Sequence, residues 1–353
     1  MERISRIRER LQVEGIDVFL VSSPINRRYL TGFTGSAGLV WISPTRQAIL
    51  TDFRYLEQVK QECPGWELIH IESYIESLTT LIEEDKVQTI AIEKEYVTVN
   101  QMEDWQEKLA PTFTGVKGWV EELRMIKSEE EVANIRKAAS IADEAFAKLL
   151  PTIRSGLTER EIALELEFLM RKAGASAMSF DPIIASGPRS ALPHARPGER
   201  ILSVGDFVVF DFGCVVNGYC SDMTRTLVIG EPEEKHLLIY DLVLEAQERS
   251  LAAVGPGKTG VEIDAIARNI ISDAGYGEYF GHGLGHSLGL EVHESPRLSK
   301  LDETVLQPGM IVTVEPGVYL PDFGGVRIED LVLVTEDGHE VLSSTFKELY
   351  VVR

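Results

Sequence analysis

The sequence predicts an α+β protein with two domains, a small N-terminal α/β domain over residues 1–122 and a larger domain over residues 123–353. Two domains are expected because the chain has 353 residues, whereas a single domain usually has roughly 100–200. Short apolar runs alternate with helical patterns in the first part, which is typical of a small α/β domain. The second part repeats an order of helix, strand and carboxylate, which predicts two related halves.

The composition is that of an ordinary globular protein, with 44% hydrophobic and 26% charged residues. The 56 acidic and 35 basic side chains give a net charge of −21, which argues against nucleic acid and against an anionic membrane as partners. No apolar run approaches the ~18 residues needed to span a bilayer, and the charged segment 1–10 does not resemble a secretory signal. Cys63, Cys214 and Cys220 lack the spacing of a metal knuckle and are expected to be reduced thiols. We therefore expect a cytoplasmic protein.

In the first domain, apolar runs and helical spacing alternate along the chain. Ile4, Ile7 and Leu11 recur at helical spacing, and further helices are predicted around residues 55–62, 74–84 and 100–109. Short apolar runs predict strands at residues 17–21, 39–42, 48–51, 68–71 and 89–93. No group of residues in this domain indicates a chemistry of its own.

The second domain opens with a strong helix start. Ser128 and Glu131 have the spacing of a capping box. Apolar residues then recur at steps of three and four until Pro151, which predicts an amphipathic helix of about twenty residues.

An internal repeat follows this helix. Segments that begin at Gly156 and Gly257, 101 positions apart, carry the same Thr-x-x-Glu capping pattern before an amphipathic helix that ends at a glycine. Two apolar strands 104 positions apart then end in a carboxylate, Asp211 in the first copy and Glu315 in the second. This ordered match predicts two pseudo-symmetric halves with a site where they meet.

The first carboxylate lies beside a predicted hairpin. Asn217-Gly218 is a strong signal for a two-residue turn. With this pair at the centre of the turn, Asp211 lies opposite Thr224 and diagonal to Asp222, whereas a two-residue shift makes Asp211 and Asp222 direct partners. In either register both carboxylates project from one face, because side chains alternate with period two.

The second half repeats the arrangement with Glu315 and Glu329, joined through a longer connection over residues 320–325. Four carboxylates on two buried hairpins would repel one another and bind protons unless cations were present. The alternative is that some of them face solvent or pair with Arg225 and Arg327. Because the acids occupy symmetric positions, we favour a metal site.

Three histidines lie between the two hairpins, His282, His286 and His293. The metalloprotease helix motif is excluded because the Glu that it places between two histidines is missing. Glycines at 281, 283, 285 and 289 indicate a closely approached backbone, on a strand rather than a helix. Beside an acid-rich site, we interpret these histidines as one metal ligand and proton donors.

These residues resemble a known family. Asp211, Asp222, His286, Glu315 and Glu329, with the runs around residues 282–286 and 314–317, resemble the five-ligand site of the pita-bread metallopeptidases. Runs 292–297 and 324–330 are similar to the proline-directed branch, first to short prolidases and then to Xaa-Pro aminopeptidases. Residues 28–33 and 51–55 resemble the creatinase/prolidase N-terminal domain of that family, so the likeness covers essentially the whole chain.

The resemblance implies a dinuclear centre and a role for each residue. Asp211 would bind one ion, His286 with Glu315 the other, and Asp222 with Glu329 would bridge both. Four carboxylates and one imidazole favour two divalent ions per chain, Mn²⁺ first, with Co²⁺, Fe²⁺ or Zn²⁺ as alternatives.

The same resemblance assigns the groups around the ions. Glu315 would be the base for the attacking water, while His194 and His293 would stabilise the intermediate or pass a proton to the leaving nitrogen. His282 would line the pocket for the residue before proline. Without the resemblance, an ordinary loop histidine and a functional one are equally good interpretations of His194. A homodimer is usual for such enzymes.

The expected function is therefore hydrolysis of the Xaa-Pro bond, most simply of dipeptides. A dipeptidase must bind the carboxylate of proline, for which Arg297 and Arg327 are the candidate guanidinium groups. The alternatives are an Xaa-Pro aminopeptidase that acts on longer peptides, another catalyst of the same fold, such as a methionine aminopeptidase or a metal-free creatine-hydrolysing enzyme, and a non-catalytic binding module.

Overall fold

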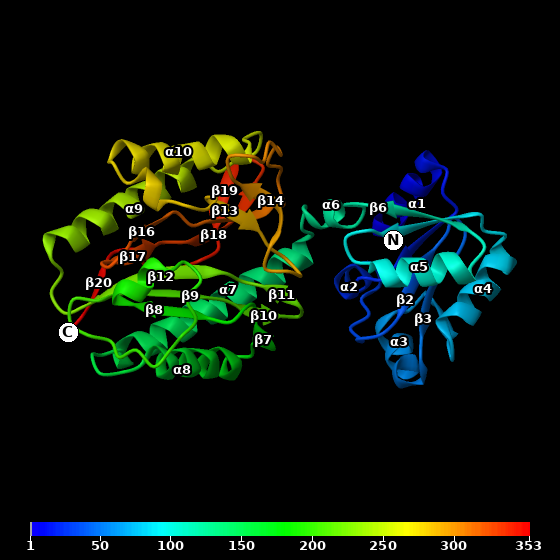
Figure 1. Ribbon diagram of the computed structural model, residues 1–353, viewed down its shortest axis with the longest axis horizontal. Coiled ribbons are helices and arrows are strands. Elements are labelled where there is room, and N and C mark those ends of the chain that lie inside the picture. The colour runs from blue at the N-terminus through cyan, green and yellow to red at the C-terminus, as the bar shows by residue number, and fades with distance from the viewer. Residues whose placement is uncertain (1) are drawn as a thin grey trace. The chain divides into compact units, whose positions relative to one another are not determined.

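The computed structural model describes residues 2–353, and the chain divides into two compact units, one that ends at Arg124 and one that begins at Met125 (Figure 1). The predicted boundary after residue 122 falls within the last helix of the first unit, α6 (Glu121–Arg124). None of the helices in the described residues is long and apolar enough to cross a membrane.

The first unit is a mixed six-stranded sheet with helices between its strands. Its strand order is β4-β3-β2-β1-β5-β6, and the pairs β1–β5, β5–β6 and β3–β4 are parallel. The other elements of this unit, in chain order, are α1 (Glu2–Glu14), β1 (Val18–Val21), α2 (Pro24–Thr31), β2 (Leu39–Ile42), β3 (Gln47–Thr51), α3 (Leu56–Glu62), β4 (Glu67–His70), α4 (Tyr74–Asp85), β5 (Thr89–Glu93), α5 (Val99–Lys108) and β6 (Thr112–Val116). Each element predicted in this part is present within one or two residues, whereas α2, β6 and α6 were not predicted.

The cysteines are buried free thiols, as expected. Burial raises the pKa of the Cys63 thiol and that of the Cys214 thiol to about 11. Because a raised pKa keeps both groups protonated at pH 8, we expect neither to react with iodoacetamide in the native protein, whereas both react after unfolding. Peptide mass mapping after timed alkylation measures this, and rapid labelling of either residue in the native state would contradict it.

The second unit is built of four sheets and four longer helices. Helices α9 and α10 lie on one side of its strands, and α7 and α8 lie on the other (Figure 1). The helices are α7 (Glu129–Leu149), α8 (Glu159–Lys172), α9 (Glu234–Ala253) and α10 (Gly260–Asp273). The strands are β7 (Ala177–Met178), β8 (Ile183–Ser186), β9 (Phe207–Phe212), β10 (Cys214–Val216), β11 (Tyr219–Cys220), β12 (Met223–Ile229), β13 (Gly285–Ser287), β14 (Glu294–Leu298), β15 (Ile311–Val314), β16 (Gly317–Leu320), β17 (Gly324–Arg327), β18 (Asp330–Thr335), β19 (Gly338–Val341) and β20 (Tyr350–Val352).

The helix starts follow the predicted caps. Capping boxes form at Ser128 of α7, Thr158 of α8 and Thr259 of α10. Thr158 and Thr259 also make equivalent isolated bridges, to Ile201 and Val305 respectively. The repeat predicted from the sequence is therefore present at the start of both helices.

The first hairpin has the register that Asn217-Gly218 predicts. Both turn residues have positive φ, 48° and 85°, as a tight two-residue turn requires. Asp211 faces Thr224 across β9 and β12, so Asp222, which lies between β11 and β12, is diagonal to Asp211. The two-residue shift is excluded.

The second hairpin consists of two ladders with a gap between them. The β15–β18 ladder ends where Val314 faces Asp330, and the β16–β17 ladder resumes where Gly317 faces Arg327. Glu315 and Glu329 lie in this gap. Each half also has its own core: one cluster is drawn mainly from residues 138–229, and the other mainly from residues 239–334.

Candidate active site

The ten residues that the sequence singles out all line one pocket of the second unit, with a volume of about 860 Å³. They are His194, Asp211, Asp222, His282, His286, His293, Arg297, Glu315, Arg327 and Glu329. The fold thus brings together residues from both halves of the repeat and from the loops beside them.

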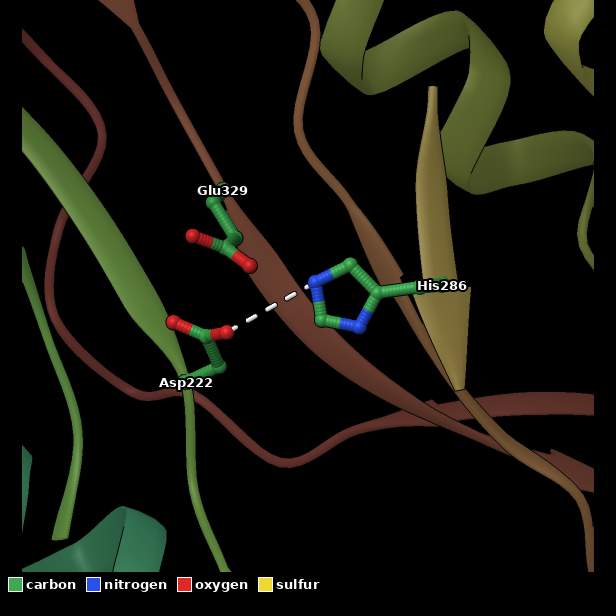
Figure 2. Close-up of side chains that lie close together, drawn as sticks. All are labelled: Asp222, His286 and Glu329. Carbon is green, nitrogen blue, oxygen red and sulfur yellow. Dashed lines mark ion pairs between the residues drawn. The ribbon is translucent and has the colours of Figure 1, made fainter. Parts of the chain in front are cut away.

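Three side chains converge at the centre of the pocket. Figure 2 shows Asp222, His286 and Glu329 pointing toward one another from separate segments, and their ligand atoms all lie within 4.8 Å of one another. Nε2 of His286 is 3.7 Å from Oδ2 of Asp222 and 3.3 Å from Oε1 of Glu315. This spacing of oxygen and nitrogen atoms can hold a cation.

The surroundings of His286 fix which ring nitrogen is available. His286 lies on β13, as the glycine pattern predicted. Its Nδ1 faces the carbonyl oxygen of Ser287 at 3.1 Å and must therefore carry the proton. Burial lowers the pKa of His286 and favours the neutral ring. Nε2 thus presents a lone pair to the acids, as a metal ligand must.

The acids are electrostatically frustrated without a cation. Burial, with repulsion from neighbouring carboxylates, raises the pKa of both Asp222 and Glu329 well above the usual range. Oδ1 of Asp211, Oδ1 of Asp222 and Oε1 of Glu329 are buried and have no hydrogen-bond partner among the described residues. Such orphaned acceptors are costly in a folded protein. Hard oxygen donors with one imidazole fit divalent cations at this position.

Two other carboxylate oxygens are held by threonines that the sequence analysis did not assign to the site. Oγ1 of Thr224 donates to Oε2 of Glu329 at 2.7 Å, and Oγ1 of Thr313 donates to Oε1 of Glu315 at 3.1 Å. Thr313 lies two residues before Glu315, and this spacing was an available signal. These bonds orient the carboxylates of Glu329 and Glu315 before any ion binds.

Arg327 lines the pocket, and its guanidinium is hydrogen-bonded to groups of the protein. Its guanidinium is only 3% exposed and donates to Oδ2 of Asp211 at 2.5 Å, to the Tyr319 hydroxyl at 2.7 Å and to Oγ1 of Thr224 at 3.1 Å. Arg327 and Glu329 approach the same atom, Oγ1 of Thr224, and both line the pocket. The geometry favours the alternative, in which Arg327 neutralises the acid cluster.

His282 is locked by the same chain of hydrogen bonds. Because the Tyr319 hydroxyl accepts from Arg327, it donates to Nε2 of His282 at 2.9 Å. Nδ1 of His282 lies 2.7 Å from the carbonyl oxygen of Gly283 and carries the proton. Both ring nitrogens are thus occupied within the protein, and burial lowers the pKa of the ring. Tyr319 carried no signal in the sequence.

His194, His293 and Arg297 are exposed side chains at the rim of the pocket. The His293 ring packs edge to face on the His286 ring, with centroids 4.4 Å apart and an angle of 68° between the ring planes. Burial together with nearby positive groups lowers the pKa of His293 to about 4. Arg297 faces His286 directly across β13 and β14, so both side chains are on one face. A guanidinium thus lies beside the candidate metal ligands without belonging to them.

Comparisons with known proteins agree with this geometry. The chain matches the creatinase/prolidase N-terminal domain over residues 3–126 and metallopeptidase family M24 over residues 133–336. It is 41% identical over 353 residues to an Xaa-Pro dipeptidase of Pyrococcus furiosus, with 99% of each chain covered.

Two solved structures are similar over nearly their full length. An Xaa-Pro dipeptidase from Bacillus anthracis has a TM-score of 0.98 and 46% identity, with 100% of this chain and 99% of that chain covered. An X-Pro aminopeptidase from Thermotoga maritima has a TM-score of 0.91 and 40% identity, with 99% of both chains covered. The predicted α+β fold, an N-terminal α/β domain followed by a pita-bread catalytic domain, is confirmed. This chain belongs to metallopeptidase family M24 and carries the creatinase/prolidase type of N-terminal domain.

Proposed function

We propose that this protein is an Xaa-Pro dipeptidase, which hydrolyses the peptide bond before a C-terminal proline. The observation that carries the proposal is the set of three bare, buried carboxylate oxygens around His286 in a pocket that also has Arg297 at its rim. The similarity to Xaa-Pro dipeptidases over the full chain supports it.

Five side chains would hold two divalent ions, with Mn²⁺ as the first candidate: Asp211, Asp222, His286, Glu315 and Glu329. When bound, such a pair of ions supplies Lewis acidity to the scissile carbonyl and lowers the pKa of water. Support comes from the orphaned oxygens and from the neutral His286 with its free Nε2. Chelation is expected to lower the melting temperature, because ions that bind only the folded chain stabilise it.

The chain's own residues would do the remaining chemistry. Glu315, held by Thr313 through its Oε1 atom, would take the proton of the attacking water. His194 and His293 at the rim would hydrogen-bond the developing oxyanion and pass a proton to the proline nitrogen. The buried pair of Arg327 and Tyr319 would keep Asp211 and His282 in place during the reaction.

A proline carboxylate needs a cationic partner. Of the two arginines, Arg297 is the one we assign to it, because its side chain is exposed in the pocket while Arg327 is fully engaged. A guanidinium can bind a carboxylate through two parallel hydrogen bonds. This contact would limit the enzyme to substrates that end at proline.

A second candidate is an Xaa-Pro aminopeptidase that acts on longer peptides. The similarity to the X-Pro aminopeptidase of Thermotoga maritima favours it. The homodimer and the cytoplasmic location expected from the sequence stay predictions, and size-exclusion chromatography with light scattering tests the first of them.

Hydrolysis of matched dipeptides tests the proposed function. We expect the Mn²⁺-loaded protein to cleave Ala-Pro and not Ala-Ala, to lose activity after chelation and to regain it when Mn²⁺ is returned. The measurement is release of free proline or alanine, with metal content determined in parallel. Cleavage of both dipeptides at similar rates, or full activity in protein shown to be free of metal, would contradict the proposal.

A further inference from the structure

The loop that carries His194 is tied to one buried carboxylate on a neighbouring helix. Glu159 is the first residue of α8, and its acidic side chain is fully buried. Oε1 of Glu159 accepts from the backbone N–H and the hydroxyl of Ser186, both at 2.8 Å. Oε2 of Glu159 accepts from the backbone N–H of Gly198 at 3.0 Å. One side chain therefore holds both ends of segment 186–198.

The carboxylate also has a charged partner inside this segment. Nε of Arg189 lies 3.1 Å from Oε2 of Glu159, and Nη2 of Arg189 donates to the carbonyl oxygen of Arg196. The arginine thus connects the buried acid to the stretch just after His194. Charge-assisted hydrogen bonds of this kind are stronger than neutral ones and fix geometry. The segment has other attachments, including the bond from the backbone N–H of Gly325 to the Ser190 hydroxyl.

The equivalent position in the other half of the repeat has no acidic side chain. The offset of the repeat aligns Glu159 with Gly260, the first residue of α10. A Cβ atom on Gly260 would lie 2.2 Å from the carbonyl oxygen of Arg297 and 2.9 Å from that of Asp302. The backbone at Arg297 and Asp302 therefore packs directly on the start of α10, whereas the loop of His194 is held through the longer Glu159 side chain.

We infer that Glu159 is a positioning residue, which acts on the reaction by fixing the loop that presents His194 to the pocket. The inference rests on the proposed function only for its kinetic part. Glu159 does not line the pocket, so it reaches the substrate only through the segment that it holds. Glu159 is not one of the five proposed metal ligands, and they give it no role.

Hydrogen exchange tests the structural part without any activity. In Glu159→Gln, the amide group cannot accept from Ser186, Arg189 and Gly198 together, because one of its two ends is a donor. We expect amides of segment 186–198 to exchange about tenfold faster or more, while amides within α8 are unchanged. Glu161→Gln is the matched control, since Glu161 is exposed on the same helix and glutamine can replace glutamate in its capping box.

Kinetics test the connection with His194. Glu159→Gln is expected to lower kcat/KM for Ala-Pro by about 10- to 100-fold, because small misplacements of a reacting group have effects of this size. The double variant Glu159→Gln with His194→Ala is expected to match His194→Ala alone, whereas a general loss of stability would multiply the two effects. Metal content and the activity of Glu161→Gln are expected to equal those of wild type.

The outcomes separate this inference from the proposed function. Wild-type protein without Xaa-Pro hydrolysis would refute the function, and the exchange result would still decide whether Glu159 fixes the loop. Two outcomes with an active wild type would refute the inference alone. One is unchanged exchange of segment 186–198 in Glu159→Gln, and the other is a double variant in which the effects of Glu159→Gln and His194→Ala on kcat/KM multiply. If Glu159→Gln does not fold, Ser186→Ala removes one of the bonds to Glu159, and unchanged exchange of segment 186–198 in that variant would overturn the inference.

Discussion

Replacing Asp222 by Asn or Glu329 by Gln is expected to lower kcat by several orders of magnitude, because both residues are proposed to bridge the two ions. A neutral amide removes one negative charge from between two cations and replaces a ligand oxygen. Oδ1 of Asp222 and Oε1 of Glu329 are two of the three buried carboxylate oxygens in the pocket that have no hydrogen-bond partner among the described residues. Steady-state kinetics with Ala-Pro and metal analysis measure the effect.

Stability separates this effect from misfolding. In metal-free protein, removal of one crowded carboxylate relieves repulsion, so we expect the variants to unfold at the same temperature as metal-free wild type or higher. The variants lose only the increase in unfolding temperature that Mn²⁺ gives the wild type. Asp322→Asn is the matched control, because Asp322 is exposed in the connection between β16 and β17. Retention of more than about a tenth of wild-type kcat in either bridging variant would contradict the two-ion site.

Replacing Arg297 by Met is expected to remove the preference for substrates that end at proline. Truncating one partner of a desolvated charge pair costs about 2–5 kcal/mol, which corresponds to roughly 30- to several-thousand-fold in kcat/KM for Ala-Pro. For the wild type, kcat/KM should fall by a similar factor when the proline carboxylate of the substrate is blocked as an amide. In Arg297→Met the free acid and the amide should become similar substrates, mainly through KM.

Lys300→Met is the control for this variant, since it removes a positive charge from an exposed residue just after β14, the strand that carries Arg297. Its kcat/KM is expected to equal that of wild type. Equal kcat/KM of the wild type for Ala-Pro and for a tripeptide Ala-Pro-Yaa would exclude the dipeptidase and favour the aminopeptidase.

Local signals in the sequence predicted the parts of the fold that depend on neighbouring residues. The Asn217-Gly218 turn determined the register of the first hairpin. Once the turn residues are fixed, each pair of facing residues along the two strands follows from the pair before it. The Ser128, Thr158 and Thr259 caps placed three helices correctly. Helix α2 was missed although Ser23, Pro24 and Gly32 supply a cap, a first-turn proline and a left-handed end, because the helix has only eight residues.

The groups that support the site were harder to predict. Tyr319 reaches Arg327 and His282 only because separate segments approach one another in the folded chain, and no spacing in the sequence encodes that approach. The clustering of the acids in one pocket could be predicted, because acids in apolar strands are unusual and here they recur at symmetric positions. The hydrogen bonds of Arg327 could not be predicted, since its partners Thr224 and Asp211 lie far from it in the sequence.

The division of the site between two halves, each with its own core, has a consequence for how the chain comes apart. Asp211 and Asp222 belong to one half, and His286, Glu315 and Glu329 belong to the other. Ions held by both sets would form a reversible, non-covalent cross-link between the halves. The halves could then separate only after the ions are released. Resistance to heat and to proteases would then depend on the rate at which the ions leave, and a chelator would shorten the lifetime of the native protein.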